Sequence, residues 1–236
     1  MRRLLGILLI AAGGCSGFVP PTAEDFRRLR LDPAPRHPEA VRYRIRLSVD
    51  SAWLAGEFDG VVLARLGPSP KARVQLFGDV GPKVVDLLAS PERILGYFPQ
   101  AHEGVDCRLP GEAAPHPLLF LGASLLEDFA DVPEERVTGV RPDPEGWWLD
   151  LKPVVPGMSS QVLRAPDGRT IERRFRWMYG VGWRERWDRP DEAEVRARGL
   201  SLLVRILESA PLERRPERVF DLEVPGDVRL VEGSRK

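Results

Sequence analysis

Apolar and polar residues alternate along most of this chain with the two-residue period of β-strands that bury one face. The clearest segment is 41–49, where Val, Tyr, Ile, Leu and Val occupy the odd positions and Arg and Ser the even ones. Such a strand is typical of an antiparallel sheet with one solvated face. Short segments of the same kind, separated by Pro, Gly, Asp or Ser, predict further strands at 53–66, 71–78, 83–89, 93–98 and 103–109.

Strand patterns return in the second half of the chain, at 136–140, 146–152, 158–165, 169–177, 180–187 and 199–208, with a closing strand at 218–224. Asp167-Gly168 is a hairpin signal between two of these strands. Gly56 and Gly60 lie inside the second strand segment, where glycine often marks a bulge or a sharp bend. The sequence therefore predicts a strongly curved sheet.

Two segments break the strand period. Residues 117–131 carry leucine and phenylalanine at three- and four-residue spacing, which predicts an amphipathic helix with a wide apolar face. Near the N-terminus, Thr22 can cap a short helix over 23–31. The predicted fold is a single, mainly β domain with short helices, in which roughly eleven strands form a curved antiparallel sheet.

The first fifteen residues have the pattern of an export signal. Two arginines precede the apolar segment Leu4–Ala12, which is too short to span a membrane. Small residues then lead to Cys15, a pattern that resembles the lipobox of bacterial lipoproteins, although Ala12 stands where that family most often has leucine. The resemblance implies cleavage before Cys15 and acylation of its thiol, and Ser16 implies sorting to the outer membrane in a Gram-negative host. A plain cleaved signal and a cytosolic protein with an apolar start remain as alternatives.

The composition excludes several classes of protein. The chain has 236 residues, with 35 Lys and Arg against 35 Asp and Glu. This neutral balance excludes a strongly basic nucleic-acid binder and an acidic tail protein. Its length suits one domain with its own core. The 23 prolines are spread along the chain, which excludes a bundle of long helices and favours short strands and turns.

Candidate chemistry is sparse. The sequence has no G-x-S-x-G, Walker, G-x-G-x-x-G or H-E-x-x-H motif. His37, His102 and His116 lie beside proline or in polar segments without metal-ligand spacing, so we expect surface roles for them. Cys107 alternates with charged residues, which predicts a buried, inert thiol. We expect no enzyme, cofactor or metal, although carboxylates that converge only in the fold are not visible in a sequence.

Aromatic residues are dense in the second half of the chain. Phe175, Trp177, Trp183 and Trp187 alternate there with arginines, an arrangement similar to a stacking platform for nucleic acid. The export signal argues against a nucleic-acid partner. We therefore expect these aromatic side chains to pack in the core, with cation–π contacts at its margin.

An export signal, an N-terminal helix, a curved antiparallel sheet and an apolar helix after the sixth strand together resemble the lipoprotein-localisation factors of the LolA/LolB type. The strand Phe58–Arg65, the hairpin Val162–Phe175 and the ending Phe220–Pro225 are similar to segments of that family, the last to its closing strand. The resemblance covers residues 22–230.

This resemblance implies an unclosed β-barrel around an apolar cavity that receives acyl chains of lipids or client lipoproteins, with helices as its lid. Such ligands need apolar burial, at about 25 cal/mol per Å², and little polar recognition. The helix at 117–131 suits a lid. The membrane-anchored member of the family also touches the membrane with an exposed apolar loop, and the segment 115–121 is either that loop or part of the lid. The residues that we expect in the cavity or lid are Ile45, Leu47, Phe58, Val74, Leu76, Leu118, Leu121, Leu125 and Phe129.

We divide the chain into a signal peptide (1–14), a lipidated tether with a short helix (15–40), a half-barrel domain (41–230) and a tail (231–236). One hypothesis is a membrane-anchored carrier or acceptor of acyl chains on the periplasmic side of the outer membrane. The other is a non-catalytic structural or assembly lipoprotein that binds an envelope protein partner and fills the cavity with side chains. An apolar pocket of several hundred Å³ would favour the first.

Overall fold

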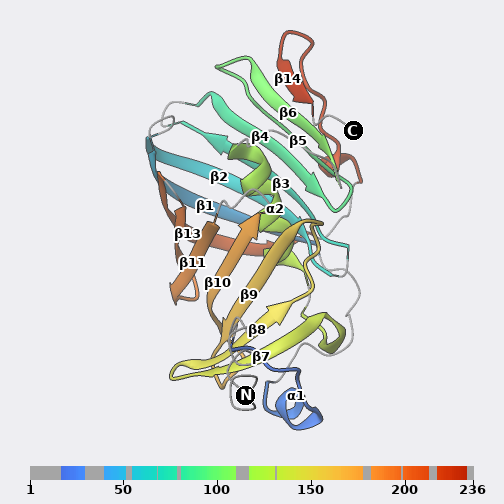
Figure 1. The fold of residues 1–236 in the computed structure, drawn as a ribbon. Helices are drawn as coiled ribbons and strands as arrows, with labels where there is room; N and C mark the ends of the chain where they lie inside the picture. Colours follow the sequence, from blue (N-terminus) through green and yellow to red (C-terminus); the bar gives the residue numbers. More distant parts are fainter. Residues whose placement is uncertain are drawn as a thin grey trace, which may run out of the picture.

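A computed structural model shows one large curved sheet that does not close into a barrel (Figure 1). Its strand order is β14-β6-β5-β4-β3-β2-β1-β13-β12-β11-β10-β9-β8-β7. Within the described residues every neighbouring pair is antiparallel except β14 with β6. The structure describes residues 17–29, 40–51, 55–67, 69–78, 81–109, 117–130, 132–177, 182–197, 199–212 and 217–232.

The first half of the chain contributes α1 (Ala23–Leu29), β1 (Ala40–Ser51), β2 (Gly56–Arg65), β3 (Lys71–Phe77), β4 (Lys83–Ser90), β5 (Arg93–Phe98), β6 (Glu103–Arg108) and α2 (Pro117–Phe129). The second half contributes η1 (Glu134–Arg136), β7 (Val137–Asp143), β8 (Gly146–Leu151), β9 (Met158–Arg164), β10 (Thr170–Trp177), β11 (Gly182–Arg189), β12 (Glu192–Ala197), β13 (Leu200–Pro211), η2 (Glu217–Phe220) and β14 (Arg229–Glu232).

The sheet consists of two meanders that meet where β13 pairs with β1. Strands β1 to β6 follow one another in space, as do β7 to β13. The long pairing of β1 with β13 joins the two meanders into one curved surface. Strands β7 and β14 form the two edges, so the barrel stays open. The predicted fold class, a curved and unclosed antiparallel sheet with short helices, is confirmed.

Three details of the sequence prediction are wrong. The expected closing strand at 218–224 is instead η2 followed by an extended segment outside the sheet, and the last strand begins at Arg229. The guanidinium of Arg73 in β3 donates to the carbonyls of Val219 (3.1 Å) and Asp221 (2.8 Å), so a side chain satisfies backbone groups that a strand partner would otherwise bond. Strand β12 was not predicted, since only Ala193 and Val195 mark its buried face.

The third correction concerns Gly60. The pairing of β1 with β2 runs without a register shift, so no bulge exists at this glycine. A Cβ atom at Gly60 would lie 2.7 Å from a methyl group of Leu76 and 3.0 Å from Ile45. Glycine is needed here because neighbouring strands bring two large side chains over its backbone.

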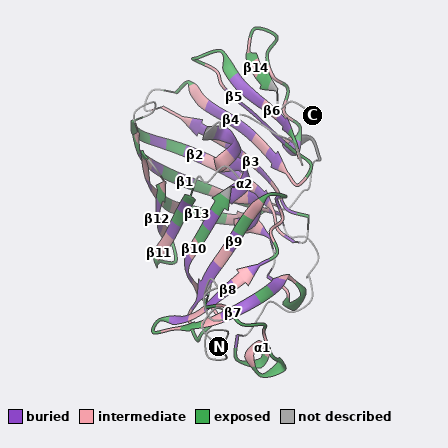
Figure 2. Cartoon of the chain, viewed as in Figure 1, coloured by how far each residue is buried: buried purple, intermediate pink, exposed green. Residues whose placement is uncertain are grey.

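The main core lies between α2 and the inner face of the sheet. Leu118, Leu119, Ala123 and Leu126 of α2 are buried against this face, and the helix packs on β3 to β6 (Figure 2). Because these residues recur at three- and four-residue spacing, they form one continuous helix face. The helix thus covers the part of the inner face that β3 to β6 form.

The N-terminal segment covers the β7 edge. The amide of Val19 donates to the carbonyl of Val140 (2.9 Å), and Val140 returns a hydrogen bond of 2.8 Å. Helix α1 then begins after Thr22, whose hydroxyl accepts from the amide of Asp25 as predicted for a capping residue. Leu29 of α1 joins a second cluster with the apolar side chains of β7 to β9. An edge strand that would otherwise offer unpaired backbone groups is thus partly covered.

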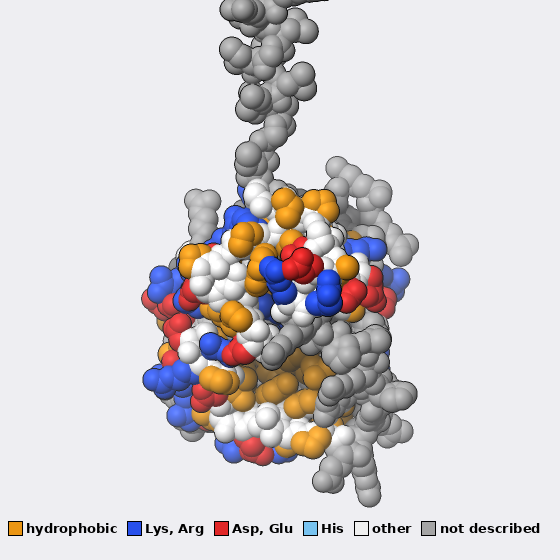
Figure 3. All heavy atoms as spheres, turned by 90° about the horizontal axis from the view of Figure 1, so that it is seen from below, with side chains coloured by type: hydrophobic (Ala, Val, Ile, Leu, Met, Phe, Trp, Pro, Cys, Tyr) orange, Lys and Arg blue, Asp and Glu red, His pale blue; other side chains and the backbone are white. Residues whose placement is uncertain are grey.

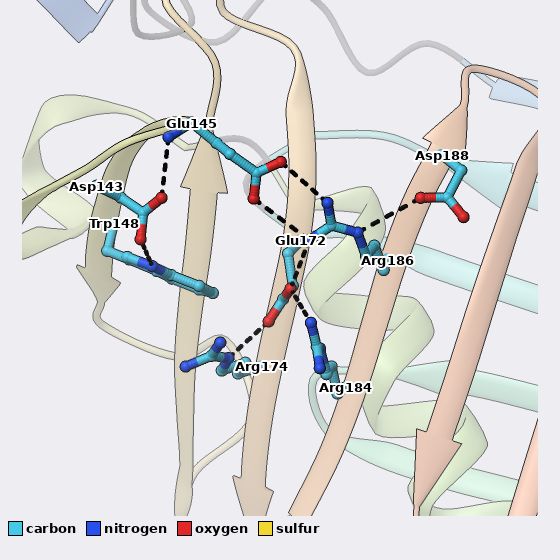
Figure 4. Close-up of polar contacts among 8 residues, drawn as sticks. All are labelled: Asp143, Glu145, Trp148, Glu172, Arg174, Arg184, Arg186 and Asp188. Carbon is cyan, nitrogen blue, oxygen red and sulfur yellow. Dashed lines mark hydrogen bonds and ion pairs between the residues drawn. The ribbon is translucent and has the colours of Figure 1, made fainter.

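A charged network fixes β10 to β11 on the outer face (Figure 4). The carboxylate of Glu172, buried at 1% exposure, accepts from Arg174 and Arg184 at 2.7 Å each and from Arg186 at 3.3 Å. Arg174 also lies over the ring of Trp148 in β8, 4.2 Å from its centroid. Burial would raise the pKa of Glu172, but the hydrogen bonds from Arg184 and Arg174 outweigh it and the pKa is lowered.

Candidate functional site

A cavity of about 360 Å³ lies between α2 and the inner face of the sheet. Strands β1, β2 and β3 form one part of its wall, β10 to β13 form the other, and α2 contributes its C-terminal half. The molecule seen from below shows a hollow whose visible wall is mostly hydrophobic (Figure 3). Tyr43 of β1 and Phe129 of α2 stack at the wall, with ring centroids 5.9 Å apart. The curvature of the sheet thus creates a space that the helix only partly fills.

The structure places seven of the nine predicted cavity residues on this wall: Ile45, Leu47, Val74, Leu76, Leu121, Leu125 and Phe129. Phe58 and Leu118 do not line the cavity but are buried in the adjoining core, at 8% and 2% exposure. Leu121 and Leu125 are only half-buried and face the cavity from the helix. Cys15, the predicted lipid anchor, lies outside the described residues.

Sequence reasoning missed the wall that β11, β12 and β13 contribute. Its residues are Trp183, Trp187, Ala193, Val195, Leu202, Val204 and Ile206. The alternation in these strands was visible for Trp183 and Trp187, which we expected in the core. These residues reach the cavity because β13 pairs with β1, and the local sequence pattern does not predict this pairing.

One end of the cavity is polar. Arg173 of β10 and Glu185 of β11 are direct cross-strand partners, and both line the cavity. Arg173 donates to the carboxylate of Asp128 in α2 (2.6 Å) and to the carbonyl of Glu127 (3.0 Å). The indole N–H of Trp183 donates to Oε1 of Glu185 (2.9 Å). Strands and helix therefore bring one guanidinium and two carboxyl groups to a wall that is otherwise mostly apolar.

The two carboxyl groups of this polar end have raised pKa values. Burial, followed by the negative charge of Asp128, raises the pKa of Glu185 well above its ordinary value of 4.5. Burial also raises the pKa of Asp128, against the attraction of Arg173. Arg173 attracts Glu185 as well, but burial, the charge of Asp128 and a side-chain hydrogen bond between the two acids outweigh this attraction, so the neutral form of Glu185 is favoured.

The end of α2 that carries this site is held in place by a buried carboxylate. Glu127, at 3% exposure, accepts from Arg136 (2.7 Å) and from the backbone amides of Val154 and Val155. Together with the Arg173 bonds, these contacts fix the last turn of the helix between η1 and β10. The polar end of the cavity is therefore preorganised.

Other candidate groups do not form a site. Among the described residues no three His, Cys, Asp or Glu side chains are grouped to hold a metal ion. Cys107 is fully buried, and burial raises the pKa of its thiol. His102 is exposed and pairs with Asp227 at 2.9 Å, while His37 and His116 lie outside the described residues. Within the described ranges no helix has the length and apolar character needed to cross a bilayer.

No protein-family model and no curated protein matches the sequence. Solved structures do match it. A proposed outer membrane lipoprotein-sorting protein domain from Vibrio parahaemolyticus is 11% identical, with a TM-score of 0.55 over 78% of this chain and 89% of that one.

Two further structures agree with this match. A LolA superfamily protein from Nitrosomonas europaea is 12% identical, with a TM-score of 0.51 over 78% of this chain and 91% of its own. A DUF1329 family protein from Desulfovibrio piger is 8% identical, with a TM-score of 0.57 over 78% and 90%. The resemblance seen in the sequence is therefore confirmed at the level of the fold, which is that of LolA-type lipoprotein-sorting domains.

Proposed function

We propose that this chain is a membrane-anchored lipoprotein that binds acyl chains of lipids or client lipoproteins in the cavity under α2, as a carrier or acceptor in the bacterial envelope. The observation that carries this proposal is the apolar cavity of about 360 Å³. Its size falls within the roughly 300–1,000 Å³ that is usual for small-molecule sites. The alternative, an assembly protein with a filled interior, is disfavoured by this open space.

The cavity volume suggests the length of chain that fits. If a methylene group occupies on the order of 30 Å³, the share of one water molecule, about 12 such groups fill 360 Å³. Each buried methylene contributes about 0.8 kcal/mol, so a twelve-carbon chain gains on the order of 10 kcal/mol before association costs. Those costs are about 4 kcal/mol or more, which leaves about 6 kcal/mol or less and a Kd of roughly tens of micromolar or weaker.

Binding of a fluorescent dodecanoyl probe to the chain from residue 15 onward tests the proposal. This chain contains every described residue, and Cys15→Ser removes the expected acylation site. The variant Leu125→Glu places a charge on the cavity wall, and we expect it to weaken binding at least tenfold, because a carboxylate there loses its hydration. The matched control is Leu207→Glu on β13, whose side chain is 47% exposed and should leave binding unchanged. Wild-type affinity in both Leu121→Glu and Leu125→Glu would contradict acyl binding under α2.

The anchor itself rests on Cys15. Two peptide units separate it from Gly17, so its Cα lies within about 8 Å of that of Gly17, two residues before Val19, which bridges to β7. This short distance would hold the β7 edge close to the bilayer. Mass spectrometry of the native N-terminus should show loss of residues 1–14 and addition of acyl groups, and Cys15→Ser should abolish both. An unmodified N-terminus at Met1 would contradict the anchor.

A further inference from the structure

Helix α2 packs directly against the sheet along its first half. A Cβ atom at Gly122 of α2 would lie 2.9 Å from a methyl carbon of Ile94 and 3.3 Å from the Cβ of Ala89. A Cβ atom at Gly96 in β5 would lie 3.3 Å from a methyl carbon of Leu118. Helix and sheet are thus as close as their side chains allow. Lifting this part of the helix would expose four apolar side chains that are at most 2% exposed, which is unfavourable: Leu118, Leu119, Ala123 and Leu126.

Polar contacts fix the last turn of the helix. Arg173 of β10 donates to the carbonyl of Glu127 (3.0 Å) and to the carboxylate of Asp128 (2.6 Å). A side-chain hydrogen bond joins Asp128 to Glu185 of β11. The carboxylate of Glu127 accepts from Arg136 (2.7 Å). Because these groups satisfy one another, moving the helix end would leave several of them unpaired, and α2 is tied to the sheet at its last turn as well.

Packed side chains also bound the cavity along the sheet. Leu149, Val162 and Arg173 are successive cross-strand partners in β8, β9 and β10, so their side chains lie on one face. Beyond Arg173 this face is filled, because Leu149 and Val162 are buried at 0% and 1% exposure in a cluster with Leu29 of α1. In the other direction α2 covers β4 to β6. Among the described residues, the space of about 360 Å³ therefore opens only toward the hollow that Figure 3 shows.

We infer that the cavity is a rigid compartment for a single acyl chain of about twelve carbons, with α2 as a fixed wall and the head group of the ligand outside. This inference rests on the proposed function and names its ligand class: single-chain amphiphiles and, of a lipid with several chains, one chain only. A ligand with two twelve-carbon chains would need about twice the volume, and the fixed helix and the packed face leave no space for it. The head group stays at the opening, because the charged groups at the polar end are bonded to one another.

The number of bound ligands and the chain length test this capacity in the chain from residue 15 onward with Cys15→Ser. Titration calorimetry with dodecanoate should give one ligand per protein. The affinity of fluorescent acyl probes should rise about fourfold per added methylene and then stay within about fourfold between about fourteen and eighteen carbons. Two or more bound ligands, or a larger rise over that range, overturns the compartment and leaves acyl binding intact. Failure of every probe to bind refutes the proposed function instead.

A second chain on the same head group tests the ligand class. Monododecanoyl and didodecanoyl glycerol linked to the same polyethylene glycol head compete with the dodecanoyl probe below the concentration at which either forms micelles. Two equivalent chains give a statistical advantage of about twofold, whereas a second buried chain adds well over about 100-fold. We expect the two-chain competitor to gain less than about tenfold, in the wild type and in the surface control Leu207→Glu on β13. A larger gain overturns the single-chain assignment.

A disulfide that locks α2 to β4 tests whether the helix moves. Ala89→Cys and Gly122→Cys, introduced together with Cys107→Ala, place two Cβ atoms 3.3 Å apart, close to the roughly 3.5–4.5 Å of disulfides. The reduced form of this variant is the matched control. We expect the oxidised form to bind the dodecanoyl probe within about threefold of the affinity and the association rate of the reduced form. A larger loss on oxidation overturns the fixed wall, and the wild-type measurements decide the inference if the variant does not fold.

Discussion

Enlarging Ala193 tests whether the volume of the cavity sets the length of the bound chain. Ala193 lies on the inner face of β12, is 2% exposed and lines the cavity. A phenyl ring at this position enters the open space and adds about six carbon atoms, half of the roughly 12 methylene-sized groups that the cavity holds. At about 0.8 kcal/mol per methylene, Ala193→Phe removes on the order of 5 kcal/mol of gross binding free energy from a twelve-carbon chain.

The assay is binding of fluorescent acyl probes of six to sixteen carbons, roughly spanning the length that fits the cavity. We expect the affinity of Ala193→Phe for the twelve-carbon probe to fall at least about 100-fold, and the preferred chain to shorten by about six carbons. Ala193→Leu should give an intermediate preference, since it fills less of the space. Ala101→Phe, in an exposed turn, is the control and should keep the wild-type profile.

The folded state of Ala193→Phe must be checked, because overpacking costs about 1–3 kcal/mol where a side chain does not fit. Circular dichroism and the thermal midpoint supply this check. A folded Ala193→Phe that binds the twelve-carbon probe with unchanged affinity refutes the reasoning, since the chain then does not occupy the cavity.

Four further predictions concern stability and reactivity. Asp86→Asn should lower the free energy of unfolding by about 2–4 kcal/mol at pH 7, because Asp86 is buried and paired. Hydrogen bonds to Asp86 lower its pKa despite burial. The difference between variant and wild type in urea unfolding should therefore shrink as the pH falls below the ordinary Asp value of 3.8. Glu185→Gln should have the opposite pH dependence. The pKa of Glu185 is raised in the folded state, so the contribution of Glu185 to wild-type stability falls as the pH rises above 4.5, and the variant's thermal midpoint should gain on that of the wild type over the same rise in pH. Gly146→Ala should cost at least about 2 kcal/mol in the same unfolding assay, because φ is +154° there and a Cβ would lie 1.9 Å from the carbonyl oxygen of Arg164. Cys107 should react with iodoacetamide only in denaturant, as peptide mapping by mass spectrometry would show, because its thiol is fully buried and burial raises its pKa.

The sheet was predictable from the sequence because its signal is local. In β1 each odd position from Val41 to Val49 is apolar and each even one polar, and the burial in the structure largely follows this alternation. Helix α2 was predictable for the same reason, since its apolar residues recur at helical spacing. The cavity residues contributed by β1, β3 and α2 could therefore be chosen before the structure was known.

Other parts of the fold depend on distant contacts that leave no local pattern. The segment after η2 alternates like a strand, yet Arg73, about 150 positions earlier, bonds its backbone carbonyls and keeps it outside the sheet. The wall formed by β11 to β13 faces β3 only because β13 pairs with β1. Asp128, Arg173 and Glu185 resemble ordinary solvated charges in the sequence, and the register of β10 with β11 and the position of α2 bring them together.

Two buried glutamates on neighbouring strands show why burial alone does not assign a role. Glu172 of β10 faces outward, accepts from three arginines, and has a lowered pKa, so its environment satisfies the charged form and makes it a structural tie. Glu185 of β11 faces the cavity, accepts from the indole of Trp183, shares a side-chain hydrogen bond with Asp128, and has a raised pKa. The same residue type on neighbouring strands is therefore held charged on the outer face, where arginines surround it, and favours the neutral form on the cavity wall, where burial and the charge of Asp128 raise its pKa.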